Sequence, residues 1–382
     1  MIIGFDGKRA VSNMTGLGNY SRLVIEQLAE NYPQDSLYVY TPKLRKNPRL
    51  ALIESMPNVA FRLPSGSGFS GALWRTFGVS NNLRADAVNV YHGLSNELPL
   101  NILSAGVPSV VTMHDVIYRR LPECYSAIDR RIYDFKYGRS CRNATRIIAV
   151  SERTKQDVVE LYGIDPAKID VVYQGCDSSF KKELRREDLY GIRKRLNLPE
   201  RYILQVGTIE SRKNLELTVR ALAGLPSDVS LLAVGRDRGG YRGKVEGIAR
   251  ELGVAARVVF RDDITFADLP SVTQMAEAVA YPSRYEGFGI PVLEALESGR
   301  PVVAATGSCL EEAGGDAAIY VDPDDVRGMT EALTAILSGV VDVEEVSAKG
   351  KRHAARFDTD RMASSIMAVY EKAIDEYAAM RE

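Results

Sequence analysis

Short apolar runs alternate with longer segments of helical periodicity along almost the whole chain. In the first half the apolar runs predict buried strands at residues 2–6, 37–41, 59–63, 87–91, 109–114, 146–150 and 169–173. The segments between them include helical patterns over residues 20–31 and 130–142, and Ser151 is placed to cap a helix over residues 154–162. This alternation is typical of parallel sheets covered by helices.

The alternation is interrupted once and then resumes. Residues 174–199 (QGCDSSFKKELRREDLYGIRKRLNLP) are polar and charged, which predicts a linker with a short helix. A second series of strands is predicted at residues 202–206, 230–234, 257–260, 278–281, 301–304 and 318–321, and a last helix at residues 359–381. We therefore predict an α/β protein with two doubly wound domains and a cleft between them. The first covers residues 1–175, the linker residues 176–199 and the second domain residues 200–358.

Composition supports this fold class and excludes several functions. The 382 residues are 45% hydrophobic and 26% charged, as in soluble globular proteins. A net charge of -1 gives no general attraction for nucleic acid, although local basic clusters could bind an anionic ligand or a membrane surface. The chain starts MIIGFDGKRA, which predicts a strand and not an export signal, and no apolar run approaches the roughly 18 residues of a spanning helix. We expect a cytoplasmic protein.

Cysteine spacing gives no indication of a metal site. Cys124, Cys141, Cys176 and Cys309 are scattered and lack the close pairs of a zinc site. We expect reduced thiols.

The stretch RYEGFGIPVLE, residues 284–294, combines a strand-to-helix turn with two acids. It follows the predicted strand 278–281, and Pro291 fits the first turn of a helix over residues 292–298. Gly287 and Gly289 allow backbone N–H groups to approach a ligand at the positive end of that helix. Favourable interaction with the helix dipole would explain Glu294 by itself, but it does not explain Glu286 beside two glycines. We therefore expect both carboxylates to accept hydrogen bonds from a polyhydroxylated ligand.

These residues resemble a family signature. Glu-x7-Glu with Gly-Phe-Gly-x-Pro inside it is similar to the signature of retaining GT-B glycosyltransferases, the large bacterial family of mannosyl- and glucosyltransferases known as glycosyl transferases group 1. The likeness covers nearly the whole chain, and PSRYEGFGIPVLEALESGRPVVAA followed by EEAGGDAAIYVDPDD carries most of it. It implies two Rossmann-like domains facing each other across a cleft. The first would lie on the acceptor side, with the helix of residues 359–382 packing back on it, and the second would bind the nucleotide sugar.

The resemblance also assigns roles around the turn. Glu286 would contact the donor sugar, and Glu294 would bind the ribose of the nucleotide. The other donor-binding positions of the turn are Gly287, Phe288, Gly289 and Ile290.

A second cluster of candidates lies in LQVGTIESRKNL, residues 204–215. A strand and a turn at Gly207 precede Arg212 and Lys213, two cations at the start of a predicted helix, where the helix dipole disfavours them. A bound pyrophosphate would resolve that conflict, because arginine offers a fork of donors and lysine a point charge. In the resembled family this segment holds the donor diphosphate, with Gly207 at its turn, and stabilises the charge of the leaving group.

A glycine-containing segment, MTGLGNY at residues 14–20, suggests a dinucleotide-binding turn only weakly. Ser21 occupies the third glycine position of that fingerprint, and the segment lies about ten residues beyond the first strand. An ordinary helix-capping loop is the alternative. By resemblance, Gly16 and Gly18 would close over the donor diphosphate.

Three histidines are present, at positions 92, 114 and 353. His92 and His114 fall at the carboxyl ends of predicted strands, where they would face the cleft, whereas His353 is expected on the solvent side of a helix. By resemblance, His114 lies beside the reacting sugar. Asp115 could orient its ring or bind the acceptor, and His92 belongs to the acceptor side.

Asp322-Pro323-Asp324 matches the Asp-x-Asp pattern of some metal sites, but helix capping explains it, with Asp322 as N-cap and Pro323 at the first helical position. We therefore expect no metal requirement.

The activity implied is transfer of a hexose, with mannose the first choice, to a glycan or lipid-linked glycan in polysaccharide or lipopolysaccharide biosynthesis. No cofactor is expected, and the donor implied is GDP-mannose, with UDP- and ADP-sugars left open because residues 261–264 depart from the family pattern. The enzyme could work at the inner face of the membrane. Alternatives are a GT-B sugar-nucleotide epimerase, a glycan phosphorylase, or a non-catalytic sugar-binding module.

Overall fold

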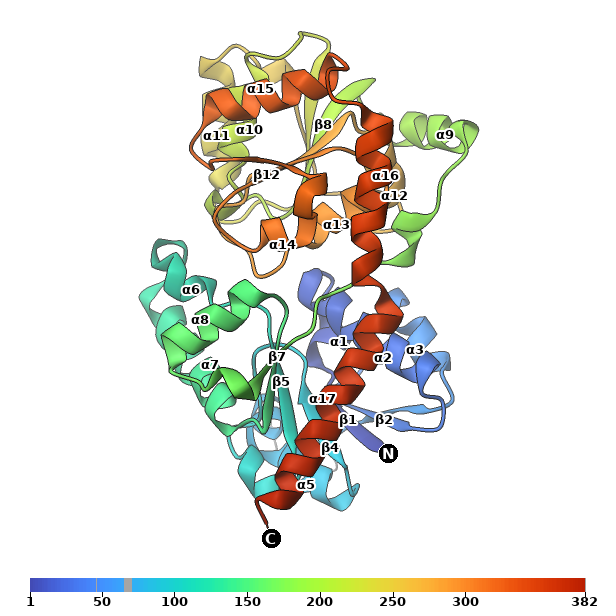
Figure 1. Cartoon of the computed structure of the whole chain (residues 1–382), viewed down its shortest axis with the longest axis vertical. Coiled ribbons are helices and arrows are strands. Elements are labelled where there is room, and N and C mark those ends of the chain that lie inside the picture. Colours follow the sequence, from blue (N-terminus) through green and yellow to red (C-terminus); the bar gives the residue numbers. More distant parts are fainter. Residues whose placement is uncertain (46, 65–70, 382) are drawn as a thin grey trace. The chain divides into compact units, whose positions relative to one another are not determined.

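The computed structural model describes residues 1–45, 47–64 and 71–381, and the chain forms two compact units (Figure 1). The first comprises Met1–Gln174 together with Thr359–Glu382, and the second comprises Gly175–Asp358. Residues 176–199, where the sequence predicted a linker, contain the short turn Ser178–Lys181 and helix α9 (Arg186–Leu196), and they are grouped with the second unit.

The first unit is built on a parallel sheet with the strand order β3-β2-β1-β4-β5-β6-β7. The strands are β1 (Ile2–Asp6), β2 (Ser36–Tyr40), β3 (Val59–Arg62), β4 (Val90–Gly93), β5 (Ser109–Met113), β6 (Arg146–Ala149) and β7 (Ile169–Val171). The central strands are buried on both faces, which is why they form continuous apolar runs in the sequence.

Helices cover both faces of this sheet. They are α1 (Lys8–Ser12), α2 (Gly16–Asn31), α3 (Ala51–Ser55), α4 (Gly71–Leu73), α5 (Val79–Ala85), α6 (Ile117–Arg120), α7 (Ala127–Asn143), α8 (Glu152–Tyr162) and α17 (Thr359–Ala379). One apolar core joins the sheet to α1, α2, α3 and α17, and a second joins it to α5, α7 and α8. The last helix, α17, lies beside α2 and across β4, β5 and β6 (Figure 1).

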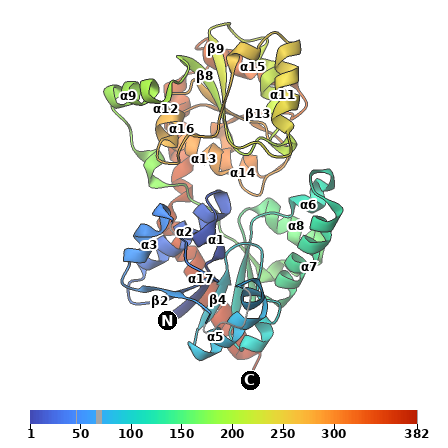
Figure 2. The same ribbon diagram turned by 180° about the vertical axis from the view of Figure 1, so that it is seen from behind.

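The second unit has a parallel sheet with the order β10-β9-β8-β11-β12-β13. Its strands are β8 (Arg201–Val206), β9 (Val229–Val234), β10 (Val258–Arg261), β11 (Ala278–Tyr281), β12 (Val302–Ala305) and β13 (Ile319–Val321). Its helices after α9 are α10 (Leu215–Leu222), α11 (Tyr241–Glu251), α12 (Leu269–Gln274), α13 (Ile290–Glu297), α14 (Leu310–Gly314), α15 (Val326–Leu337) and α16 (Val343–Ala354). Helices α10, α11 and α15 pack on one face, and α12, α13 and α16 lie on the other (Figure 2).

Both sheets reverse their strand order once, between β1 and β4 in the first unit and between β8 and β11 in the second. At such a reversal point the connections leave in opposite directions and open a crevice beyond the carboxyl ends of the two strands. The fold therefore marks two positions where a ligand can bind, one in each unit.

No helix in the described part of the chain is long and apolar enough to cross a membrane.

Candidate active site

The turn between β11 and α13 carries Glu286 and depends on a glycine. Gly289 has φ +113°, and a Cβ there would lie 2.7 Å from Cδ2 of Leu310, so a side chain is excluded by both backbone conformation and packing. Pro291 lies in the first turn of α13, as predicted. The side chain of Phe288 is buried against Phe357, with ring centroids 5.5 Å apart. Phe288 can therefore offer a ligand only its backbone.

The buried thiol of Cys309 forms hydrogen bonds with the same turn. Sγ of Cys309 donates to the backbone carbonyls of Glu286, at 3.1 Å, and Phe288, at 3.0 Å. Two carbonyl groups of the turn are therefore bonded to a side chain inside the protein. The sequence predicts no more for Cys309 than a reduced thiol, because its neighbours in space are about 20 residues away in the chain.

Arg212 and Lys213 follow β8 in a short 3-10 turn, Ser211–Lys213, and so precede α10 instead of opening it. Asn214 has a left-handed backbone, and its side chain donates to the carbonyls of Pro282 and Pro323, at 3.2 and 2.7 Å. Gln205 on β8 donates to the carbonyl of Lys213 at 2.8 Å. The two cations therefore extend from a backbone that is fixed on several sides.

The structure brings Glu286 and the two cations together. One carboxylate oxygen of Glu286, Oε1, accepts from Nη1 of Arg212 at 2.7 Å and from Nζ of Lys213 at 2.6 Å. Lys213 also donates to the hydroxyl of Tyr281 at 2.7 Å, and Nη2 of Arg212 donates to Glu210 at 2.7 Å. β8 supplies the cations and β11 supplies the acid, so the cluster lies at the reversal point of the second sheet.

Burial and charge act against each other in this cluster. Burial by itself would raise the pKa of Glu286, but Arg212 and Lys213 outweigh it and lower that pKa to about 2. Burial lowers the pKa of Lys213, and the charge of Glu286 opposes this shift. The carboxylate is therefore ionised at neutral pH and lies within hydrogen-bond distance of both cations.

Glu294 does not join this cluster. It is buried in the second turn of α13, and burial, with a further contribution from Asp177, raises its pKa to about 8. No hydrogen bond links it to Arg212, Lys213 or Glu286 among the described residues. At neutral pH Glu294 is therefore largely a neutral carboxylic acid, which can both donate and accept hydrogen bonds.

The remaining donor-side glycines have different structural roles. Gly207 directly follows β8 with φ +143°, and its carbonyl lies so close to Gly235 that a Cβ on Gly235 would come within 1.9 Å of it. Gly16 and Gly18 were predicted in a loop, but they lie in the first turn of α2. A Cβ on Gly18 would lie 1.9 Å from the carbonyl oxygen of Asn13, whereas one on Gly16 would meet nothing within 4 Å. Packing alone explains Gly18.

His114 lies directly after β5 and is held in one orientation. Its Nε2 is 2.9 Å from the carbonyl of Leu94, and its backbone N–H donates to Oδ1 of Asn96 at 2.7 Å. Its ring meets the edge of Tyr20, with centroids 4.6 Å apart. Burial lowers the pKa of His114 to about 4, so the ring is neutral at pH 7. Asp115, half-buried, accepts from the backbone N–H of Ile117 at 3.2 Å.

The prediction that His92 faces a cleft is wrong. The side chain has no exposed surface, with Nδ1 2.6 Å from the hydroxyl of Tyr370 on α17 and Nε2 2.7 Å from that of Thr112 on β5. Burial, together with His114, lowers the pKa of His92 to about 3. His92 therefore attaches the last helix to the first sheet and cannot contact an acceptor in this structure. The hydrophobic pattern of α17 does not show which strand residue it covers, so no local pattern predicts this role of His92.

Two further expectations need correction. His353 is half-buried, not on the solvent side, with Nε2 3.1 Å from the carbonyl of Ala313. The N-cap after β13 is Asp325, which accepts from the N–H of Gly328 at 2.8 Å, and not Asp322. Asp322 instead accepts from the N–H of Asp324 within the preceding turn.

Among residues 1–45, 47–64 and 71–381, no group of three or more His, Cys, Asp or Glu could hold a metal ion.

Comparison with known proteins identifies both halves of the chain. Residues 14–180 match Glycosyltransferase Family 4, and residues 191–353 match Glycosyl transferases group 1. D-inositol 3-phosphate glycosyltransferases of Mycobacterium tuberculosis and Mycobacterium bovis are 34% identical to this chain over 248 residues. That match covers 63% of this chain and 51% of the relatives, so the chain spans about half of their length.

Solved structures show the same fold. HepE of Anabaena, in complex with UDP and glucose, has a TM-score of 0.77 at 20% identity over 97% of this chain and 100% of its own. WaaG, a glycosyltransferase involved in lipopolysaccharide biosynthesis, has a TM-score of 0.70 at 18% identity over 98% of this chain and 99% of its own. With a Glycosyltransferase Family 4 region followed by a Glycosyl transferases group 1 region, the chain belongs to the glycosyltransferases of GT-B fold.

Proposed function

We propose that the protein is a glycosyltransferase that takes a sugar from a nucleoside-diphosphate donor and transfers it to a hydroxyl group of an acceptor. The observation that carries the proposal is the cluster of Glu286, Arg212 and Lys213 beside the Gly287–Gly289 turn, at the strand reversal of the second sheet. Guanidinium and ammonium groups bind phosphate oxygens strongly, and the adjacent turn offers backbone donors to sugar hydroxyls. We place the donor diphosphate on the two cations.

The proposed chemistry breaks the bond between the anomeric carbon and the diphosphate oxygen and forms a bond from that carbon to the acceptor oxygen. Negative charge develops on the leaving diphosphate, where Arg212 and Lys213 stabilise it without reorganisation. We propose retention at the anomeric carbon, with the leaving phosphate taking the proton of the acceptor hydroxyl on the same face. Neutral His114 would support the sugar, and no metal ion would be required because the cations neutralise the diphosphate.

We propose a hexose as the transferred group, with GDP-mannose as the first donor to test and UDP- and ADP-sugars after it. The names of the similar proteins add UDP-glucose as a donor and D-inositol 3-phosphate as an acceptor to the panel. Arg261, near the end of β10, is bonded to Asp263 and to the carbonyl of Leu196, so a contact between its guanidinium and the base would have to displace these partners.

A donor panel tests the proposal. Binding of GDP, UDP, ADP and their common sugars is measured by calorimetry, and release of nucleoside diphosphate is then followed with and without acceptors and with EDTA. The proposal predicts binding of at least one sugar nucleotide and acceptor-dependent release that EDTA leaves unchanged. Absence of sugar-nucleotide binding would contradict it. Nucleotide release and sugar isomerisation without any acceptor would indicate an epimerase, and a requirement for inorganic phosphate would indicate a phosphorylase.

A further inference from the structure

Tyr281 is a buried side chain to which the proposed function assigns no role. It is the last residue of β11, it is 2% exposed, and it pairs in register with Ala304 on β12. Its hydroxyl accepts a hydrogen bond from Nζ of Lys213 at 2.7 Å. The apolar run of residues 278–281 predicts only a core position here. The polar end of the ring therefore needs a separate explanation.

A second buried tyrosine in the same unit shows an ordinary arrangement. Tyr202 on β8 is 0% exposed, and its hydroxyl donates to the backbone carbonyl of Val272 at 2.6 Å. Such a bond satisfies a buried phenol with an uncharged partner. The hydroxyl of Tyr281 instead contacts one of the two cations on which we place the diphosphate. The two tyrosines are therefore matched in burial and differ in the partner of the hydroxyl.

Two side chains determine where the ammonium of Lys213 lies. Nζ donates to Oε1 of Glu286 at 2.6 Å and to the hydroxyl of Tyr281 at 2.7 Å, and it lies 4.8 Å from the centroid of the Tyr281 ring. The stem of Lys213 lies beside Gly207, where a Cβ would be 3.4 Å from Cε of the lysine. An ammonium has three N–H donors in a tetrahedral arrangement, so two hydrogen bonds also fix the direction of the third N–H. A flexible side chain is thus held in one orientation.

The two partners of Lys213 differ in charge. The carboxylate of Glu286 is ionised and is shared with Arg212. Burial, with a contribution from Glu286, raises the pKa of Tyr281 well above its usual value, so this partner is a neutral phenol at neutral pH. A phenol oxygen orients an ammonium without cancelling its charge. Lys213 therefore keeps more attraction for an anion than it would have between two carboxylates.

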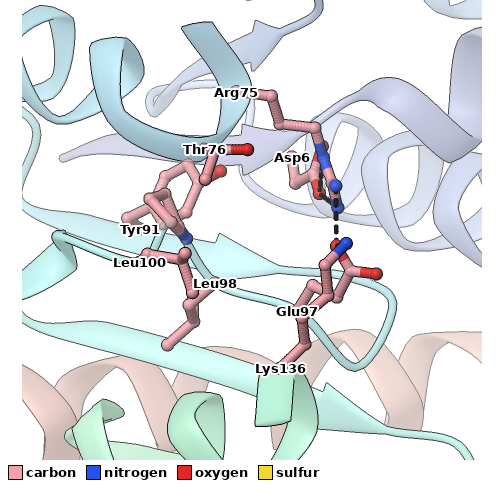
Figure 3. Close-up of a pocket in the computed structure, with 9 residues that line it drawn as sticks. Asp6, Arg75, Thr76, Tyr91, Glu97, Leu98, Leu100 and Lys136 are labelled. Carbon is pink, nitrogen blue, oxygen red and sulfur yellow. Dashed lines mark hydrogen bonds and ion pairs between the residues drawn. The ribbon is translucent and has the colours of Figure 1, made fainter. Parts of the chain in front are cut away.

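A pocket in the first unit, at the end of β1, shows the contrasting arrangement (Figure 3). Nε and Nη2 of Arg75 donate to Oδ2 of Asp6 at 2.9 and 2.5 Å, and its Nη1 donates to Oε2 of Glu97 at 2.7 Å. A cation between two carboxylates is already neutralised. Lys213 has a phenol where Arg75 has a second acid.

We propose that Tyr281 is a positioning residue for the donor diphosphate: its hydroxyl, together with Glu286, orients Lys213 so that the third N–H of the ammonium meets a phosphate oxygen. The inference rests on the proposed glycosyltransferase function and deepens its donor site. An ammonium that the ligand has to order loses conformational entropy on binding, and a preoriented one does not. A preoriented ammonium also stabilises the leaving diphosphate without rearrangement.

Tyr281→Phe tests the inference, because it removes the hydroxyl and keeps the ring. Affinities for GDP, UDP and ADP are measured by calorimetry, and thermal unfolding confirms that each variant is folded. We expect Tyr281→Phe to weaken binding of the nucleotides that the wild type binds by about fivefold, because the ligand then has to order the ammonium. Tyr202→Phe is the matched control: it also loses a buried hydrogen bond, but it should change these affinities by less than about twofold. Equal affinities of the two variants would overturn the proposal.

A double-mutant cycle with Lys213→Met distinguishes positioning from a direct contact between the hydroxyl and the ligand. A residue that acts through Lys213 has no further effect once the ammonium is gone, so Tyr281→Phe should change the affinity of Lys213→Met by less than about twofold. Additive effects of the two substitutions would overturn the proposal. The comparison of the two tyrosines does not depend on the folding of Lys213→Met.

The same measurements separate this inference from the proposed function. If the wild-type protein binds none of the three nucleotides, the proposed function fails and the role of Tyr281 fails with it. If nucleotide binds and the substitutions are additive, only the role of Tyr281 is overturned.

Discussion

Glu286 joins the two cations of the charge cluster in the second unit. One oxygen of its buried carboxylate accepts hydrogen bonds from both Arg212 and Lys213. Without this carboxylate the two cations would lose a shared negative partner. Removing one member of such a cluster costs more than the cluster contributes, because the remaining charges stay desolvated. Substitutions here need a folding control as well as an activity measurement.

Glu286→Gln should lower the transfer rate by about 100-fold, because the neutral amide no longer holds both cations where leaving-group charge develops. The measurement is initial rate at saturating donor, with thermal unfolding to confirm a folded protein. Arg238→Ala is the control, since Arg238 is 65% exposed and, within the part of the chain that the structure describes, its side chain forms an ion pair only with Glu210, at 3.3 Å. Its rate should stay within about twofold of wild type. Near-native turnover of Glu286→Gln would show that our role for this residue is wrong.

Glu294 predicts a pH dependence of stability with a definite sign. Its pKa of about 8 in the folded protein exceeds the ordinary value of 4.5, so the native state binds more protons between these pH values. The favourable contribution of Glu294 to the free energy of unfolding is fully present below about pH 4.5 and is lost as pH rises through 8. In urea unfolding, the free energy of unfolding of Glu294→Gln minus that of wild type should therefore rise by about 3–5 kcal/mol between pH 5 and pH 9. A constant difference across this range would contradict the assignment.

At the scale of elements, the chain follows local sequence signals closely. All thirteen predicted strands are present within about three residues of their predicted ends, because strands that are buried on both faces require continuous apolar runs. The turn at Glu286 and the helix after it were also predicted, since glycine and proline specify that geometry directly. The starts of two helices differ from the prediction: α2 begins at Gly16, and α15 is capped by Asp325. Several residues near these starts can serve as caps, and packing selects one of them.

Gly18 and Gly16 provide a matched test of the first turn of α2. Gly18→Ala should destabilise the protein by about 2 kcal/mol, because its Cβ would clash with the backbone carbonyl of Asn13. Gly16→Ala should be neutral or stabilising by up to about 1 kcal/mol, since nothing lies near its Cβ and alanine restricts the unfolded chain. Chemical denaturation measures both. Equal effects would show that the close approach at Gly18 is not real.

At the scale of the whole molecule, the chain consists of two units with separate cores, and the last helix returns to the first unit. The apolar pattern predicted the number of sheets and the interruption near residue 174. It could not predict the partners in space: Cys309 under the Glu286 turn, Tyr370 on His92, or Arg75 between Asp6 and Glu97. Such contacts join residues that are 21 to 278 positions apart, and local patterns carry no record of them.

Tyr370→Phe tests whether the units behave independently. The substitution removes the hydroxyl that bonds buried His92, so the first unit should lose about 1–3 kcal/mol of unfolding free energy. Nucleotide binding by the second unit should keep its dissociation constant. Tyr377→Phe, on the same helix but half-buried, is the control and should change neither quantity. A large loss of nucleotide affinity in Tyr370→Phe would contradict the assignment of donor binding to the second unit.

The most direct measurement is a crystal structure of the protein with a nucleoside-diphosphate sugar bound. Our account predicts that the diphosphate oxygens lie within hydrogen-bond distance of Arg212 and Lys213, with the sugar hydroxyls at Glu286 and the backbone of Gly287–Gly289. A diphosphate bound away from both cations, in a crystal where the nucleotide is fully occupied, would contradict the central claim.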